Sequence, residues 1–207
     1  MVLKNRIRKW ENCIWTGILL LLLVVIVGIR FDYCFDLNDD VLMKDILAGV
    51  YTGTPAGHNI QMLWPVSGFI SLLYRMFPKM PCYGLFLCLC QYGSIALVVC
   101  RGLSFCKKAV AKACWIVAAG VLSLGLLLPQ LVSLQYTVTC TLLAAAAAFL
   151  FVTTDAGLAA GAFIKKNIGT VLLVVLAFLI RSEMLLLVMP LICMAGVMKW
   201  GSEEKTF

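Results

Sequence analysis

Long apolar runs alternate with short polar segments along this chain. The first apolar run covers residues 14–29, and later runs cover roughly 83–99, 113–128, 138–152, 168–180 and 184–197. A helix needs about 20 apolar residues to cross a bilayer, so the ends of the shorter runs are approximate. The pattern predicts an all-α polytopic membrane protein with about six transmembrane helices.

The last two apolar runs are separated only by Arg181, Ser182 and Glu183. They could form one long bent helix or two helices. In a single helix, Arg181 and Glu183 would lie in the middle of the membrane, at a cost of several kcal/mol if they were unpaired. We therefore expect two helices, with these charges at the outer membrane surface.

Two shorter amphipathic segments follow the first long run. The first, residues 40–50, has two faces at helical period. Its apolar stripe is formed by Leu42, Met43, Ile46, Leu47 and Val50, and its polar side by Asp40, Lys44 and Asp45. The second, residues 66–77, has Pro65 in its first turn, and its stripe is formed by Val66, Phe69, Ile70, Leu73, Met76 and Phe77, with Arg75 opposite. We expect both helices to lie parallel to the membrane surface.

An acidic turn opens the first of these amphipathic helices. Asn38 is placed to act as its N-cap, and Asp39 and Asp40 would lie in the first turn, where carboxylates face the positive end of the helix dipole. Capping alone would explain both acids. The alternative is that one of them is a general base, because the pKa of a carboxylate near an apolar boundary can be tuned for that role.

Composition and charge distribution agree with a membrane protein. Hydrophobic residues make up 63% of the 207 residues and charged residues 13%, which leaves no room for a large soluble domain. With the N-terminus inside, 12 of the 17 Lys and Arg residues fall on the cytoplasmic side, as the positive-inside rule requires. This bias accounts for the net charge of +7, so we expect membrane lipid and no nucleic acid as a partner.

These features predict a single membrane domain over residues 1–207. Its parts are a basic cytoplasmic head (1–13), a first transmembrane helix (14–30), an external loop with two interfacial helices (31–81), the remaining transmembrane helices (82–200) and a cytoplasmic tail (201–207). Both termini would be cytoplasmic, and the protein would reside in the cell or plasma membrane.

The cysteines and the single histidine give no metal-ligand pattern. Most of the ten cysteines lie within apolar segments, where a thiol behaves as a small hydrophobic group. The pair Cys88 and Cys90 does not have a zinc-site spacing. We assign no metal site and no cofactor to these residues, although a divalent metal at the acidic turn remains open.

The arrangement of these elements resembles the amino-terminal part of the GT-C superfamily of integral-membrane glycosyltransferases. The resemblance rests on a spanning helix, the acidic turn at Asp39 and Asp40, two surface helices, and the polar segment from Arg181 to Glu183. It implies transfer of a sugar from a polyprenyl-phosphate donor, with the catalytic acid at Asp39 or Asp40. Asp39 is preferred because the superfamily's acid usually lies at the start of the helix.

Substrate-binding residues are predicted in the same region. Arg181 could hold a lipid-linked phosphate or pair with Glu183, and the residues leave both alternatives open. Arg75 could also contact a substrate, but binding to lipid headgroups at the interface is the favoured explanation. His58, Gln61 and Trp64 follow a glycine-rich turn and could contact a sugar, but an ordinary loop histidine and an interfacial tryptophan explain them as well.

The chain is shorter than the members of the superfamily that it resembles. Superfamily members generally have more spanning helices, so we expect a fragment, a truncated product or a subunit whose partner supplies the missing helices. The alternative function is a noncatalytic membrane protein, either a degenerate relative or a scaffold that binds lipid-linked sugars. A transporter is disfavoured because no spanning segment carries a convincing charge pair in mid-membrane.

Overall fold

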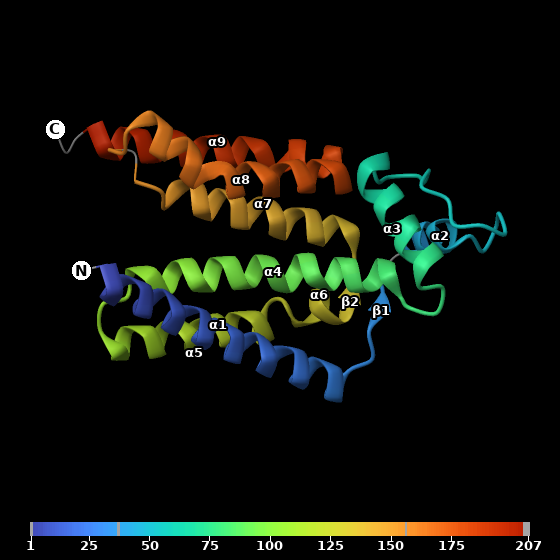
Figure 1. Ribbon diagram of the computed structural model, residues 1–207, viewed down its shortest axis with the longest axis horizontal. Helices are drawn as coiled ribbons and strands as arrows, with labels where there is room; N and C mark the ends of the chain where they lie inside the picture. The colour runs from blue at the N-terminus through green and yellow to red at the C-terminus, as the bar shows by residue number, and fades with distance from the viewer. Residues whose placement is uncertain (1, 37, 156, 205–207) are drawn as a thin grey trace.

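Six helices aligned along one axis form the body of the molecule (Figure 1). The computed structural model describes residues 2–36, 38–155 and 157–204, and gives side chains for all of these except 2–6, 38 and 202–204. Successive helices of the body run in opposite directions. They are α1 (Val2–Arg30), α4 (Cys82–Phe105), α5 (Ala109–Gly125), α7 (Tyr136–Val152), α8 (Ala160–Ile180) and α9 (Ser182–Glu204).

Four segments of the described chain are long and apolar enough to cross a membrane. They are Ile7–Arg30, Cys82–Phe105, Ala160–Ile180 and Ser182–Gly201. The helices α5 and α7 are also apolar, but each has only 17 residues. The nearly all-helical structure is thus compatible with the predicted integral membrane protein, whereas the predicted number of six crossings stays a prediction.

The last two apolar runs form two helices, as predicted. Helix α8 ends at Ile180, and Arg181 adopts an extended backbone with φ −157° and ψ 97° before α9 begins. Helix α9 also tolerates Pro190 in its interior. The predicted tail, 201–207, extends beyond the described residues.

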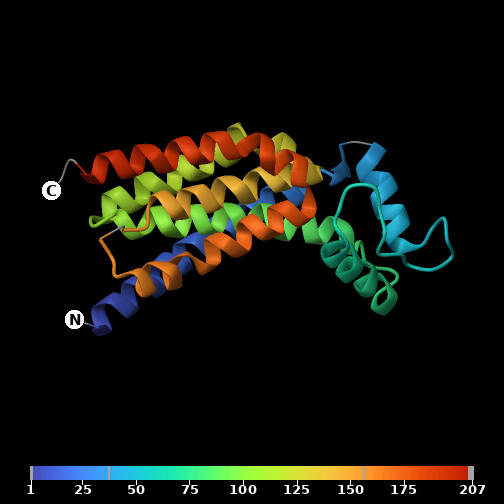
Figure 2. The ribbon, with the colours of Figure 1, turned by 90° about the horizontal axis from the view of Figure 1, so that it is seen from above.

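The two predicted short helices cross one end of the body at a steep angle to the long helices (Figures 1 and 2). They are α2 (Asn38–Ala48) and α3 (Trp64–Met76), and each begins within two residues of its predicted start. We call this end of the molecule the outer end, and the opposite end, where α1 begins and α9 finishes, the inner end. Asp39 and Asp40 lie in the first turn of α2, as predicted. The side chain of Asn38 lies outside the described residues, so its capping role stays a prediction.

Helix α3 differs from its predicted stripe. Its buried face carries Val66, Ile70 and Tyr74, together with the small residues Ser67 and Ser71. Phe69 and Met76, which we had assigned to the packed stripe, are 53% and 61% exposed. The serines let α3 approach the loop before it closely, since Ser67 donates to the carbonyl of Gly57. A prediction from helical periodicity that considers only apolar residues does not identify a buried face that contains serines.

A short parallel strand pair joins two distant parts of the outer end. Strand β1 (Cys34–Phe35) pairs with β2 (Ser133–Leu134), which directly follows the short helix α6 (Leu128–Val132). The sequence analysis did not predict these three elements. The pairing fixes the start of α2 beside the start of α7, because α2 follows β1 and α7 follows β2.

The core lies mainly around α7. In its alanine-rich segment, Ala144, Ala146 and Ala147 are no more than 1% exposed. Small residues allow close approach of neighbouring helices in lipid, and this alanine segment forms the packed face of α7. A second, smaller core cluster contains Leu23, Val99 and Leu131, between α1, α4 and α6.

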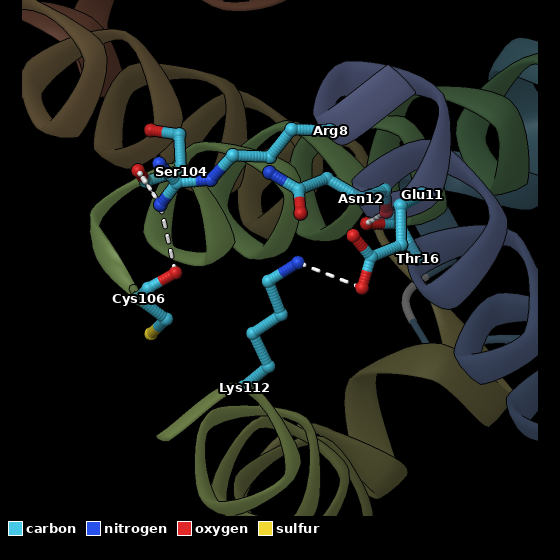
Figure 3. Close-up of polar contacts among 7 residues, drawn as sticks. All are labelled: Arg8, Glu11, Asn12, Thr16, Ser104, Cys106 and Lys112. Atoms are coloured by element: carbon cyan, nitrogen blue, oxygen red, sulfur yellow. Dashed lines mark hydrogen bonds and ion pairs between the residues drawn. The ribbon is translucent and has the colours of Figure 1, made fainter. Parts of the chain in front are cut away.

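Polar contacts fasten α1 at the inner end (Figure 3). Arg8 donates to the carbonyls of Ser104 at 3.2 Å and Cys106 at 2.8 Å, where α4 ends. Lys112 of α5 is 8% exposed and forms an ion pair of 2.8 Å with Glu11. These contacts hold the beginning of α1 against both α4 and α5.

Candidate functional site

The buried carboxylate of Asp40 is the centre of the outer end. Its side chain is 0% exposed. Oδ1 accepts a hydrogen bond of 2.6 Å from the Tyr83 phenol and one of 3.1 Å from the backbone N–H of Tyr136. Oδ2 is buried and has no hydrogen-bond partner among the described residues.

Both partners of Asp40 lie at the beginnings of long helices. Tyr136 is the first residue of α7, so Asp40 accepts one of the backbone N–H groups that no residue of α7 itself can satisfy. Its negative charge also faces the positive end of the α7 dipole. Tyr83 lies in the first turn of α4, and its own N–H donates to the Tyr74 phenol of α3 at 3.1 Å. Asp40 thereby connects α2 to α4 and α7.

The position of Asp40 corrects the sequence interpretation, which assigned it to the polar side of α2. Asp40, Met43 and Leu47 recur at i, i+3 and i+7, and all three are 0% exposed. Asp40 belongs to the packed face because Tyr83 and α7 satisfy its carboxylate there. The remaining polar residues of that helix behave as predicted, with Lys44 and Asp45 partly exposed and paired at 2.8 Å.

Burial changes the acidity of Asp40. Desolvation raises the pKa of its carboxyl from an ordinary value of 3.8 to about 6, because the charged form is disfavoured away from water. The hydrogen bonds from Tyr83 and Tyr136 act in the opposite direction, and the nearby charges of Asp36 and Asp39 add to the rise. Protonation of Asp40 therefore falls close to physiological pH.

Asp39, the adjacent acid, is exposed. It lies close enough to the Tyr136 phenol to act on it electrostatically, as do Asp40 and Arg181. The two acids of the turn thus have different environments: Asp40 is buried and hydrogen-bonded within the protein, whereas Asp39 is exposed and accessible to a ligand.

Arg181 approaches Tyr136 from the other side. Its guanidinium lies over the Tyr136 ring, with Cζ 4.8 Å from the ring centroid, and Nη1 donates to the Thr137 hydroxyl. The buried Nε has no partner among the described residues. No ion pair to Glu183, which is exposed, occurs within the described chain. A guanidinium held in this way can still donate to an anion from a nitrogen that these contacts leave unpaired.

The other predicted ligand residues lie farther along the chain, between the end of α2 and the beginning of α3. His58 and Trp64 are exposed and Gln61 is partly exposed. Leu63, next to Trp64, donates its N–H to the carbonyl of Leu179 at 2.9 Å, which attaches the start of α3 to the end of α8 near Arg181.

Arg75 fastens the glycine-rich loop. This exposed side chain donates to the carbonyl of Pro55 at 3.0 Å, which holds the loop to α3. The lipid-headgroup contact considered for Arg75 stays a prediction.

Sequence reasoning missed Tyr83, Tyr136 and Thr137 as members of this site. Tyrosines at helix ends are common in membrane proteins, where they lie at the interface, so neither Tyr83 nor Tyr136 was distinctive. The available signal was that both begin apolar helices on the same predicted side of the membrane as Asp40.

The site combines a buried acid, an exposed acid and a partly buried guanidinium. Among the described residues, no group of three His, Cys, Asp or Glu side chains is arranged to hold a metal ion. Asp39 can accept a proton or a hydrogen bond from a ligand hydroxyl, and Arg181 can bind a phosphate or carboxylate.

Comparison of the chain with protein-family models, with curated proteins and with solved structures finds no match.

Proposed function

We propose that this chain is a membrane glycosyltransferase of the GT-C type, or a part of one. It would transfer a sugar from a polyprenyl-phosphate-linked donor to an external acceptor. The observation that best supports this proposal is geometric: the exposed Asp39 adjoins Asp40, which accepts the N–H of Tyr136, and the guanidinium of Arg181 lies over the Tyr136 ring. Such a transfer needs a base for the acceptor hydroxyl and a positive group for the donor phosphate.

The two acids divide the work in this proposal. Asp39 acts as the base, since its carboxylate is exposed to an incoming acceptor. Asp40 positions the turn, because its hydrogen bonds with Tyr83 and Tyr136 fix the first turn of α2 against α4 and α7. This assignment agrees with the preference for Asp39 drawn from the resemblance.

Arg181 holds the donor phosphate. The contacts with Tyr136 and Thr137 orient the guanidinium, and a nitrogen that they leave unpaired would donate a charge-assisted hydrogen bond to a phosphate oxygen. In this proposal Trp64, Gln61 and His58 provide a stacking face and hydrogen bonds for the sugar, and Glu183 and Arg75 are further substrate-binding candidates.

The proposed topology has six crossings, with α2 and α3 on the external surface and both termini in the cytoplasm of a cell or plasma membrane. Its support is the excess of bases on the inner side. The outward apolar face of α3, formed by Phe69, Leu72 and Met76, suits contact with the membrane surface.

Labelling of introduced cysteines tests this topology. In a variant without native cysteines, a thiol introduced at Ala56 should react from outside, and one at Ser202 only after permeabilisation. The reverse pattern would refute the topology.

The chain is proposed to act with further helices, from a partner subunit or from a longer protein. Donor contacts in the superfamily come in part from helices later than the sixth. Assays should therefore use the complete protein or its partner complex.

Replacement of Arg181 tests the donor site. Arg181→Gln should reduce both binding of the polyprenyl-phosphate sugar and turnover by at least tenfold, because a charge-assisted contact is lost. The matched control is Lys44→Gln, which removes a base of the same region that is already paired with Asp45. Unchanged donor binding in Arg181→Gln would contradict the proposal.

A noncatalytic protein that binds lipid-linked sugars is the second candidate. It is favoured by the structural role of Asp40, which explains an acid at this turn without any chemistry. In that case the complete protein would bind the donor through Arg181 and show no transfer.

A further inference from the structure

An apolar crevice separates α1 from α4 at the outer end, where Figure 1 shows the two helices diverging. Its volume is about 720 Å³, within the range of sites that hold small ligands. The walls include Leu20, Val24, Leu85, Leu89, Phe35 and Leu134. Both helices are long and apolar enough to cross a membrane, so in a bilayer the crevice adjoins lipid.

The contacts of α1 explain why this space remains open. The inner end of α1 is fastened by Arg8 and by the pair of Glu11 and Lys112, and β1 attaches the chain beyond its outer end to β2. Between these attachments, Gly93 of α4 lines the crevice without a side chain. A Cβ built on Gly93 would meet nothing within 4 Å. An unfilled apolar void forfeits dispersion contacts on all its walls, so a lipid chain stabilises it.

The depth of the crevice corresponds to one leaflet. On α1 the wall is formed by Leu20 and Val24, which are about 6 Å apart along the helix. On α4 it runs from Gly84 to Gly93, which is about 14 Å. Half of a hydrocarbon core of about 30 Å is the same length. The crevice therefore matches one acyl chain of a single leaflet and is too shallow for an extended polyprenyl chain.

Two bases that lie close in sequence to lining residues of the crevice suit a phosphate. Arg30 lies three residues before the lining residue Tyr33, and Lys79 lies two residues before the lining residue Pro81. Both bases are exposed, and within the described chain neither forms an ion pair. The phenols of Tyr33 and Tyr92, which also line the crevice, are 3.3 Å apart, and one donates a hydrogen bond to the other.

We propose that the crevice binds one acyl chain of a glycerophospholipid, with the headgroup phosphate between Arg30 and Lys79. The bound lipid fills the space between α1 and α4 and supports the outer half of α1. This site is separate from Asp39 and Arg181, and its occupant is a resident lipid of the outer leaflet rather than the sugar donor.

The test compares two glycine replacements in the full chain purified in a mild detergent with its lipids. Gly93→Phe places a ring in the crevice, whereas the matched control, Gly169→Phe, replaces a glycine of α8 that also has open space around it and lies outside the crevice. Native mass spectrometry should detect one phospholipid bound to the wild type and to the control. The bound fraction of Gly93→Phe should be at least tenfold lower.

Two further measurements test whether the phospholipid detected by mass spectrometry occupies the crevice. Stripping lipid should lower the thermal midpoint of the wild type but not that of Gly93→Phe, whose ring replaces the chain. The double variant Arg30→Gln/Lys79→Gln leaves the crevice itself intact, and it should also lose the phospholipid. The proposal would be overturned if Gly93→Phe or the double variant retained the lipid at the wild-type level. It would also be overturned if the wild type bound none or if the bound mass were that of a polyprenyl phosphate.

Discussion

The phenol of Tyr83 donates a hydrogen bond of 2.6 Å to Oδ1 of Asp40 across 43 residues of chain, and both side chains are 0% exposed. With the N–H of Tyr136 on the same oxygen, this contact joins the beginnings of α2, α4 and α7. The arrangement gives Asp40 a role in stability that can be separated from any role in catalysis.

Replacing Asp40 with alanine should destabilise the protein by about 2–4 kcal/mol. The change leaves the Tyr83 phenol and the Tyr136 N–H buried without an acceptor, and each orphaned group costs about 1–3 kcal/mol. Asp40→Asn should lose less stability than Asp40→Ala, because its amide oxygen can accept both hydrogen bonds, while its Nδ2 takes the buried place of Oδ2, which has no partner among the described residues. Thermal unfolding in detergent measures the difference. Equal loss of stability in both variants would show that the charge, and not the acceptor, is what matters.

Stability should depend on pH through Asp40. Its pKa is raised to about 6 in the folded protein from an ordinary value of 3.8, so the folded state binds the proton more tightly. The resulting stabilisation is complete below pH 4 and is lost as the pH rises through 6, to a total of about 3 kcal/mol.

A comparison with Asp40→Asn isolates this titration from that of the other acids. The thermal midpoint of the variant relative to the wild type should rise between pH 4 and pH 7. A constant difference across that range would mean that Asp40 titrates at its ordinary value.

Two neighbouring residues of α3 should respond differently to a buried charge. Ile70 is 0% exposed and Phe69 is 53% exposed. Ile70→Asp should destabilise the protein in detergent by several kcal/mol, because an unpaired carboxylate would be desolvated. Phe69→Asp should change the stability by only about 0.5 kcal/mol. If both changes were severe, Phe69 would have to be packed against protein.

Hydrophobic patterning predicted the helices well because burial in a helix repeats with a fixed local period. It placed α2 and α3 within two residues of their observed starts and separated α8 from α9 at Arg181. The local pattern could not place Asp40, whose partners lie 43 and 96 residues away. For the same reason it missed β1 and β2, which are two residues long and depend on each other.

The local pattern also treated Asp39 and Asp40 as nearly equivalent, although one is exposed and the other buried. Their helical positions differ by about 100°, so a small error in the direction of the packed face exchanges their environments. The choice between them depends on tertiary contacts with α4 and α7.

The same two residues provide the decisive test of chemistry. If Asp39 is the base, Asp39→Asn should lower turnover by about 10²–10⁴-fold while insertion, folding and donor binding persist, since an amide cannot take the acceptor's proton. Asp40→Asn keeps the hydrogen bonds that position the turn, so its turnover should stay within a few-fold of the wild type. The assay uses the complete protein or its partner complex with a polyprenyl-phosphate sugar.

A large loss in Asp40→Asn together with normal turnover in Asp39→Asn would transfer the catalytic role to the buried acid, whose pKa near 6 suits a proton carrier. Near-wild-type turnover in both would leave helix capping and Asp40's contacts with Tyr83 and Tyr136 as the sufficient explanation of the acidic turn.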